Sequence, residues 1–144
     1  GFKNRALAYL LKAHGLFKDD VEDVLECYFR ACSIRVCSRD LAYIGMALAN
    51  HGRKFKTEER FFPAEYARFV NAVLMICGMY DGSGEFAVRV GVPAKSGVGG
   101  GIMAVAPTRM GIGIYSPALD EKGNSIAGIQ ALERLSRRMY LSIF

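Results

Sequence analysis

The 144-residue sequence has no uninterrupted apolar run that approaches the ~18–20 residues a transmembrane helix requires. It has two isolated histidines, His14 and His51, and its four cysteines include no C-x-x-C pair, so the spacing typical of zinc sites is missing. Disorder is excluded because 51% of the residues are hydrophobic and only 23% are charged. We therefore expect a globular chain of one-domain size, with no membrane span and no metal site.

Neither the cysteines nor the basic residues indicate a binding or catalytic site. Three of the thiols fall in or near helical patterns, so we expect reduced, buried cysteines in a cytoplasmic protein; the four are Cys27, Cys32, Cys37 and Cys77. The net charge is +5, and the densest basic run is Arg53-Lys54-Phe55-Lys56. Nucleic-acid binding would need a basic stripe with aromatics or a known module, so we interpret this run as solvated surface.

Apolar residues recur at helical spacing in the first half of the chain. The pattern predicts four helices, over residues 4–14, 21–32, 38–50 and 63–77. Asp19 or Asp20 offers an N-cap for the second helix, and Ser38 offers one for the third. Gly15, Gly52 and Gly78 supply the stop signals.

The period changes in the second half. Alternating residues predict a half-exposed strand over 86–92, and residues 101–106 and 110–115 predict two more strands joined by a turn. Glycines in 110–115 suggest a helix packed closely on that strand. Ser125 can cap a last helix, over 126–139. The order predicts an α+β fold, with a possible boundary near Gly78–Gly84 between helical and sheet halves that could equally form one continuous fold.

A glycine-rich stretch, residues 78–101, holds the most distinctive chemistry. Lys95-Ser96-Gly97 precedes Val98, and three glycines follow it, so a ligand could approach the Val98 backbone N–H closely. The alternative is a glycine-rich β-bulge packed under a helix, and both interpretations stay open. A phosphate loop is disfavoured because no Gly-Lys-Ser/Thr follows the glycines.

Three polar side chains are further candidates. Tyr80 follows a helix-ending glycine at an exposed position, where a phenol could relay a proton; the alternative is a packed turn tyrosine. Tyr28 lies on the apolar stripe of a predicted helix, a position that is also typical of a tyrosine packed in the hydrophobic core. Asn4 opens a helix, where an N-cap role is the simple explanation.

Several short sequence blocks follow one another in a specific order and spacing along the whole chain. They are Asn4-Arg5-Ala6-Leu7-Ala8-Tyr9, Tyr28-Phe29 with Cys32-Ser33-Ile34, Leu48-Ala49-Asn50, Cys77-Gly78-Met79-Tyr80-Asp81, Pro93-Ala94-Lys95-Ser96-Gly97-Val98, Ser116-Pro117, Leu119-Asp120 and Gly123-Asn124-Ser125. In this order the chain resembles the C-terminal half of a bacterial glutaminase of the serine-dependent, β-lactamase-like family. The resemblance implies part of a β-lactamase/transpeptidase-like fold across residues 1–144, mainly helical over 1–78 and with the sheet and terminal helix over 79–144.

The resemblance implies hydrolysis of L-glutamine to L-glutamate and ammonia with no metal or organic cofactor. It implies substrate contacts from Asn4, Tyr28 and Tyr80, proton transfer by Tyr80, and an oxyanion donor in the Val98 N–H. Lys95, with Ser96 as a further secondary candidate, either shapes the field at the site or pairs with a carboxylate. The resemblance also implies a homo-oligomer, often a tetramer, with no nucleic-acid or membrane partner.

The nucleophilic Ser-x-x-Lys motif of that family occurs nowhere in these residues. We therefore expect the motif upstream of Gly1, and we expect this chain to be a fragment that is inactive alone. Two alternatives stay open: a non-catalytic interaction or assembly module, and a penicillin-recognising acylase. The serine of Lys-Ser-Gly and the surrounding glutaminase-like blocks stand against the acylase.

Overall fold

The computed structural model describes residues 1–57 and 59–144, which form two compact units. The first unit is Gly1–Arg35 and the second is Val36–Phe144, so Gly78–Gly84, a possible boundary in the sequence, lies inside the second unit. Within the described residues, no helix combines the length and hydrophobicity that crossing a bilayer requires.

The first unit is a pair of helices, α1 (Phe2–Ala13) and α2 (Val21–Cys32). The Asp20 carboxylate accepts hydrogen bonds from the backbone N–H groups of Glu22 and Asp23, which confirms Asp20 as the N-cap of α2. The two helices pack through a small apolar cluster, made of Ala8, Val21 and Leu25 with Phe17 and Phe29.

The second unit is a three-stranded antiparallel sheet with helices around it, in the strand order β1–β2–β3. Its elements along the chain are α3 (Ser38–Ala49), α4 (Ala64–Cys77), the 3₁₀ turn η1 (Tyr80–Gly82), α5 (Ser83–Arg89), β1 (Ala94–Ser96), β2 (Gly101–Ala106), β3 (Met110–Tyr115) and α6 (Ile126–Met139). The predicted α+β class is confirmed.

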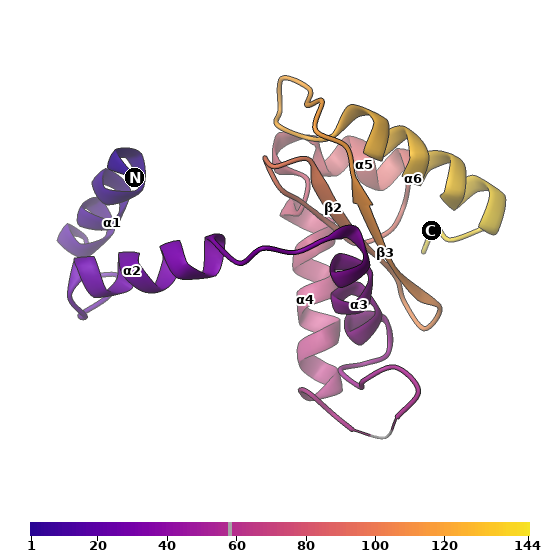
Figure 1. Ribbon diagram of the computed structural model, residues 1–144, viewed down its shortest axis with the longest axis horizontal. Coiled ribbons are helices and arrows are strands. Elements are labelled where there is room, and N and C mark those ends of the chain that lie inside the picture. The colour runs from indigo at the N-terminus through magenta and orange to yellow at the C-terminus, as the bar shows by residue number, and fades with distance from the viewer. Residues whose placement is uncertain (58) are drawn as a thin grey trace. The chain divides into compact units, whose positions relative to one another are not determined.

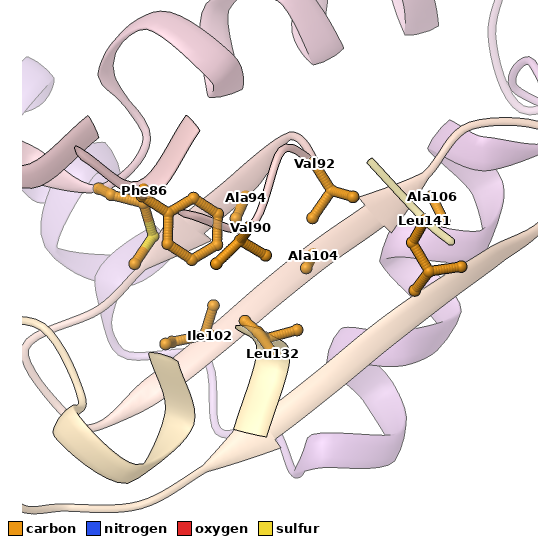
Figure 2. Close-up of a cluster of buried hydrophobic side chains, with 10 residues drawn as sticks. Phe86, Val90, Val92, Ala94, Ile102, Ala104, Ala106, Leu132 and Leu141 are labelled. Carbon is orange, nitrogen blue, oxygen red and sulfur yellow. The ribbon is translucent and has the colours of Figure 1, made fainter. Parts of the chain in front are cut away.

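The sheet lies between two helical layers (Figure 1). Successive side chains of β2 point to opposite faces, so this strand contributes to a hydrophobic cluster on each side. Ile102 and Ala104 face the layer that contains α5 and α6, where they join the main core; its labelled side chains in Figure 2 are Phe86, Val90, Val92, Ala94, Ile102, Ala104, Ala106, Leu132 and Leu141. Met103 and Val105 face α3 and α4 and pack with Leu48, Ala49, Ala67 and Leu74.

Glycines in β3 let α3 approach the sheet closely. A Cβ on Gly113 would lie 1.8 Å from the Ser38 carbonyl oxygen, and one on Gly111 would lie 2.0 Å from the Met46 nitrogen. Neither space can hold a methyl group, so the expectation that a helix packs tightly on this strand is confirmed.

The predicted strand over residues 86–92 is wrong. Residues 83–89 form α5 instead, and the first strand of the sheet is the short β1 at 94–96. Phe86 and Val90 are buried at helical i,i+4 spacing, whereas Val88 is 88% exposed, so the apparent alternation was misleading. The Glu85–Arg89 ion pair at 2.9 Å also has helical spacing.

Two smaller expectations also need correction. Ser38 is the first residue of α3 rather than its N-cap; the N-cap is Cys37, whose N–H donates to the Asp40 carboxylate at 2.8 Å and so lowers the pKa of that carboxyl. The cysteines are free, as expected, but all four are exposed in this chain rather than buried. Helical spacing placed Cys27, Cys32 and Cys77 on helices but did not distinguish the inner from the outer face of each helix.

Candidate active site

Tyr80 has a left-handed backbone that its neighbours hold in place. Its φ is 51°, a conformation that costs a non-glycine residue about 1–3 kcal/mol. The Ser83 hydroxyl accepts a hydrogen bond from the Met79 N–H at 3.0 Å and donates to the Tyr80 carbonyl at 2.8 Å. Because Ser83 is only 5% exposed, these two bonds lie away from competing solvent and fix the turn.

Asn124 ties a second loop to the same turn. Its side-chain NH₂ donates to the Met79 carbonyl at 3.1 Å, and its backbone N–H donates to the Asp120 carboxylate at 2.8 Å. The side chain is 1% exposed, so the first of these bonds is buried. The turn that contains Tyr80 is therefore fixed from both sides, by Ser83 within it and by Asn124 across from it.

Val98 lies in the hairpin turn between β1 and β2. The turn is closed by two hydrogen bonds of 2.9 Å, from Gly97 N–H to Gly101 O and from Gly100 N–H to Gly97 O. Among the residues that the structure describes, none accepts a hydrogen bond from the Val98 N–H, and Val98 is 72% exposed. The alternative of a β-bulge packed under a helix is therefore wrong.

Tyr80 and Val98 meet at Gly123. A Cβ on Gly123 would lie 3.7 Å from the Tyr80 ring and also 3.7 Å from a Val98 methyl carbon. The φ of Gly123 is +90°, a conformation that glycine adopts without strain. The structure thus brings these two predicted residues to one place, beside the loop that Asn124 anchors.

Lys95 approaches the same tyrosine. Its ammonium nitrogen lies 4.6 Å from the centroid of the Tyr80 ring, and it also donates to the Ser96 carbonyl. In the described part of the chain Lys95 has no carboxylate partner, so the expected alternative of an ion pair is wrong. Partial burial lowers the pKa of Lys95, and the nearby Cys77 acts in the opposite direction.

Ser96 is separated from this group by the pleat of β1. Its side chain is 2% exposed and points to the opposite face from Lys95, as the register opposite Ile102 and Met103 requires. None of the described residues forms a hydrogen bond with the Ser96 hydroxyl oxygen. The geometry therefore gives Ser96 no contact with Tyr80 or Val98.

Asn4 and Tyr28 belong to the first unit, whereas Tyr80, Val98 and Lys95 belong to the second. Asn4 is half-buried and is the third residue of α1; the N-cap is Gly1, so the N-cap interpretation of Asn4 is wrong. Tyr28 is 51% exposed, with its ring 5.9 Å from that of Phe29, so it is no core tyrosine of this unit.

The region around Tyr80 contains its phenol, the Lys95 ammonium and the side chain of Val98, and the Val98 N–H has no acceptor among the described residues. Oxyanion stabilisation and proton transfer need groups of these kinds. Within residues 1–57 and 59–144, no group of three or more His, Cys, Asp or Glu side chains is placed to hold a metal ion. Ser83 was not predicted as a site residue, because α5, which begins at Ser83, was predicted as a strand over 86–92.

Comparisons with known proteins identify the family. The glutaminase family model matches residues 1–144. The glutaminase of Clostridioides difficile (strain 630) is 57% identical over 144 residues, covering 100% of this chain and 47% of that protein. The Clostridium tetani glutaminase is 58% identical with the same coverage. The chain thus spans about half the length of the curated relatives it matches.

Solved structures agree with the sequence matches. The Bacillus subtilis glutaminase, in its covalent complex with 5-oxo-L-norleucine, superposes with a TM-score of 0.95 at 44% identity, over 99% of this chain and 51% of that one. The α+β arrangement is therefore part of a β-lactamase-like fold. With sequence and structure in agreement along its whole length, this chain belongs to the glutaminase family.

Proposed function

We propose that residues 1–144 form one part of an enzyme that hydrolyses L-glutamine to L-glutamate and ammonia. The family match over all 144 residues carries this proposal. Support from the site comes from Tyr80 and Val98, whose side chains both lie close to Gly123, and from the Val98 N–H, which has no acceptor among the described residues.

The reaction passes through a serine acyl-enzyme. A serine hydroxyl from a Ser-x-x-Lys motif attacks the side-chain amide carbon, and the motif lysine accepts its proton. The Val98 N–H stabilises the negative oxygen of the tetrahedral intermediate, and one such donor is worth about 10²–10³ in rate. Tyr80 passes a proton to the departing nitrogen, the C–N bond breaks, and ammonia leaves; water then hydrolyses the ester to glutamate.

Asn4 and Tyr28 bind the amino-acid end of the substrate in this proposal. An amide side chain can accept from an ammonium group and donate to a carboxylate, and a phenol can do either. Asn4 is half-buried and Tyr28 is 51% exposed, so both side chains are accessible in the first unit.

Turnover measurements on two polypeptides test this function. The first is residues 1–144 alone, and the second joins them to the half of the C. difficile glutaminase that they do not match, which we call the complemented enzyme. We expect no glutamine hydrolysis by the first, because it contains no Ser-x-x-Lys motif, and ammonia release by the second. Turnover by residues 1–144 alone, or a folded but inactive complemented enzyme, would contradict the proposal.

We further propose that the enzyme is a cytoplasmic homo-oligomer, a tetramer in its complete form. Free, unbridged cysteines suit a reducing compartment. One face of α4 exposes an apolar stripe suited to subunit contacts, made of Tyr66, Phe69, Val70, Val73 and Ile76. Sedimentation of the complemented enzyme tests the assembly, and a monomer at every concentration would contradict it.

A further inference from the structure

Building on the proposed function, we propose that the loop over residues 116–124 sets the placement of Tyr80 and Val98 relative to each other, and that Asp120 is the positioning residue of this loop. The Asp120 carboxylate holds the loop in shape, and the loop contacts the two turns that carry Tyr80 and Val98. Asp120 acts through these two residues and does not itself touch the reacting atoms.

Asp120 closes the far end of the loop with both its side chain and its backbone. Its carboxylate oxygen Oδ1 accepts hydrogen bonds from the backbone N–H groups of Lys122 at 3.0 Å and Asn124 at 2.8 Å. Its own N–H donates to the Asn124 carbonyl at 2.8 Å, and its carbonyl accepts from the Gly123 N–H at 3.0 Å. An aspartate that binds backbone N–H groups shortly after itself builds a compact turn. The side chain at 120 therefore fixes the backbone as far as Asn124.

The loop contacts the hairpin turn of Val98 at two places. At the start of the loop, the Ser116 N–H donates to the Gly100 carbonyl at 2.9 Å, and a Cβ on Gly100 would lie 2.5 Å from the Ser116 carbonyl oxygen. At the far end, a Cβ on Gly123 would lie 3.7 Å from a Val98 methyl carbon. The placement of this hairpin turn therefore depends on the shape of the loop between Ser116 and Gly123.

The far end of the loop also contacts the turn of Tyr80. The Asn124 side-chain NH₂ donates to the Met79 carbonyl at 3.1 Å, and the Cβ position of Gly123 lies 3.7 Å from the Tyr80 ring. A Cβ on Gly82 would lie 3.3 Å from the Asn124 side-chain nitrogen, so the turn and the loop are closely packed. A loop that changes shape would therefore move Tyr80 relative to Val98.

The base of the loop is fixed independently of Asp120. The Ile126 N–H donates to the Ala118 carbonyl at 3.0 Å, and Ser125, which is fully buried, caps α6 by accepting from the Gly128 N–H at 3.1 Å. Loss of the Asp120 carboxylate should therefore loosen the far end of the loop and leave its attachment to α6 in place. A misplacement of about 1 Å can cost an enzyme on the order of 10² in rate.

Kinetics of variants at residue 120 in the complemented enzyme test the proposal. We expect Asp120→Ala to lower kcat by about 10–10²-fold. KM should stay within about twofold, because Asn4 and Tyr28, which bind the amino-acid end, lie in the first unit. Asp120→Asn should keep kcat within about twofold of the parent, since an amide oxygen can accept the same two hydrogen bonds.

Glu121→Ala is the matched control, because it removes an exposed acidic side chain from the same loop and should leave kcat unchanged. Asp120→Ser covers the case in which Asp120→Ala does not fold. A serine hydroxyl makes the same kind of bond more weakly, so we expect an intermediate kcat. A merely structural role would lower the thermal unfolding midpoint and leave kcat of the folded enzyme unchanged. That result, or an asparagine variant as slow as the alanine or serine variant, would overturn the positioning role.

NMR of the 144-residue chain separates this proposal from the proposed function. Nuclear Overhauser effects from the Gly123 α-protons to the Tyr80 ring and to the Val98 methyl groups should be present in the parent chain and in Asp120→Asn. They should weaken in Asp120→Ala and Asp120→Ser, and unchanged effects there would overturn the proposal. If they weaken as expected but Tyr80→Phe and Val98→Pro keep normal turnover in the complemented enzyme, the placement by the loop is supported and the proposed chemistry of Tyr80 and Val98 is wrong.

Discussion

Tyr80 and Val98 come from different segments of the chain, yet each lies 3.7 Å from the Cβ position of Gly123. Tyr80 is fixed by the turn before α5, and Val98 is fixed by the hairpin between β1 and β2. Gly123 itself lies in a loop that the Asn124 side chain anchors to the Met79 carbonyl. The proposed chemistry depends on this proximity of Tyr80 and Val98, whose backbone N–H has no acceptor among the described residues.

Replacing Val98 by proline removes the proposed oxyanion donor and little else. The Val98 N–H has no acceptor among the described residues, and proline favours the second position of a β-turn, where Val98 lies. We expect Val98→Pro to lower kcat of the complemented enzyme by about 10²–10³. Val98→Ala, which keeps the N–H, should retain most activity. Equal activity of the proline and alanine variants would remove Val98 from the mechanism.

Tyr80→Phe tests proton transfer by the phenol. The ring, its contact with Lys95 and the Ser83 hydrogen bonds to the backbone all remain in this variant. We therefore expect an unchanged unfolding midpoint and a loss of about 10²–10⁴ in kcat, the usual contribution of a general acid or base. The measurement is steady-state ammonia release together with thermal unfolding. Near-normal turnover would show that another group supplies the proton.

The sequence predicted the long elements well, because helix periodicity and strand composition reflect burial directly. Residues 101–106 and 110–115 form strands as expected, and the glycines of β3 correctly indicated a close helix. The error at 86–92 arose because Phe86 and Val90 fit a period of four as well as a period of two, and only tertiary packing decides between them.

The candidate site could be predicted only in part. A glycine-rich turn reveals an accessible backbone N–H locally, so Val98 was identifiable from its neighbours. The partners of Tyr80 were not, because Ser83 acts through a bond that forms only if residues 83–89 are helical. Gly123 and Asn124 reach the turn across a long sequence separation, which no local pattern encodes.

A glycine substitution tests the packing of α3 on the sheet. Gly113→Ala would place a methyl group 1.8 Å from the Ser38 carbonyl oxygen, so strand and helix must separate. We expect the free energy of unfolding to fall by about 1–3 kcal/mol or more. Gly84→Ala is the matched control: nothing lies within 4 Å of its Cβ position, and alanine is worth up to about 1 kcal/mol in a helix. Denaturant unfolding of both variants measures the difference, and equal stabilities would contradict the packing.

The lowered pKa of Lys95 predicts an alkaline limit to turnover. The ammonium loses its proton below the ordinary lysine value of 10.5, and with it the attraction to the Tyr80 ring. We therefore expect kcat to fall as the pH rises through that lowered pKa, and Lys95→Arg, which stays charged, to move the fall to higher pH. Cys77 acts electrostatically on Lys95, so the profile should be repeated with Cys77→Ser. An alkaline limb that is the same for lysine and arginine would assign the titration elsewhere.

The lowered pKa of Lys95 also makes the stability of the fold depend on pH. Stability is expected to rise with pH, whereas turnover is expected to fall. Because the folded-state pKa of Lys95 lies below its unfolded value, the charged lysine costs stability, fully so below the folded pKa. That cost disappears as the pH rises from the folded to the unfolded value. The free energies of unfolding of Lys95→Met and of the parent chain should therefore differ less and less as the pH rises over that range. A difference that stays constant would contradict the desolvation cost of Lys95.

The most direct test is a crystal structure of the complemented enzyme after reaction with 6-diazo-5-oxo-L-norleucine, the reagent that forms the covalent complex in the B. subtilis glutaminase. We expect the Val98 nitrogen to lie within about 3.2 Å of the ligand's ketone oxygen, and the Tyr80 hydroxyl to lie within hydrogen-bonding distance of the modified serine or the ligand. A covalent adduct with both groups turned away from it would contradict the account.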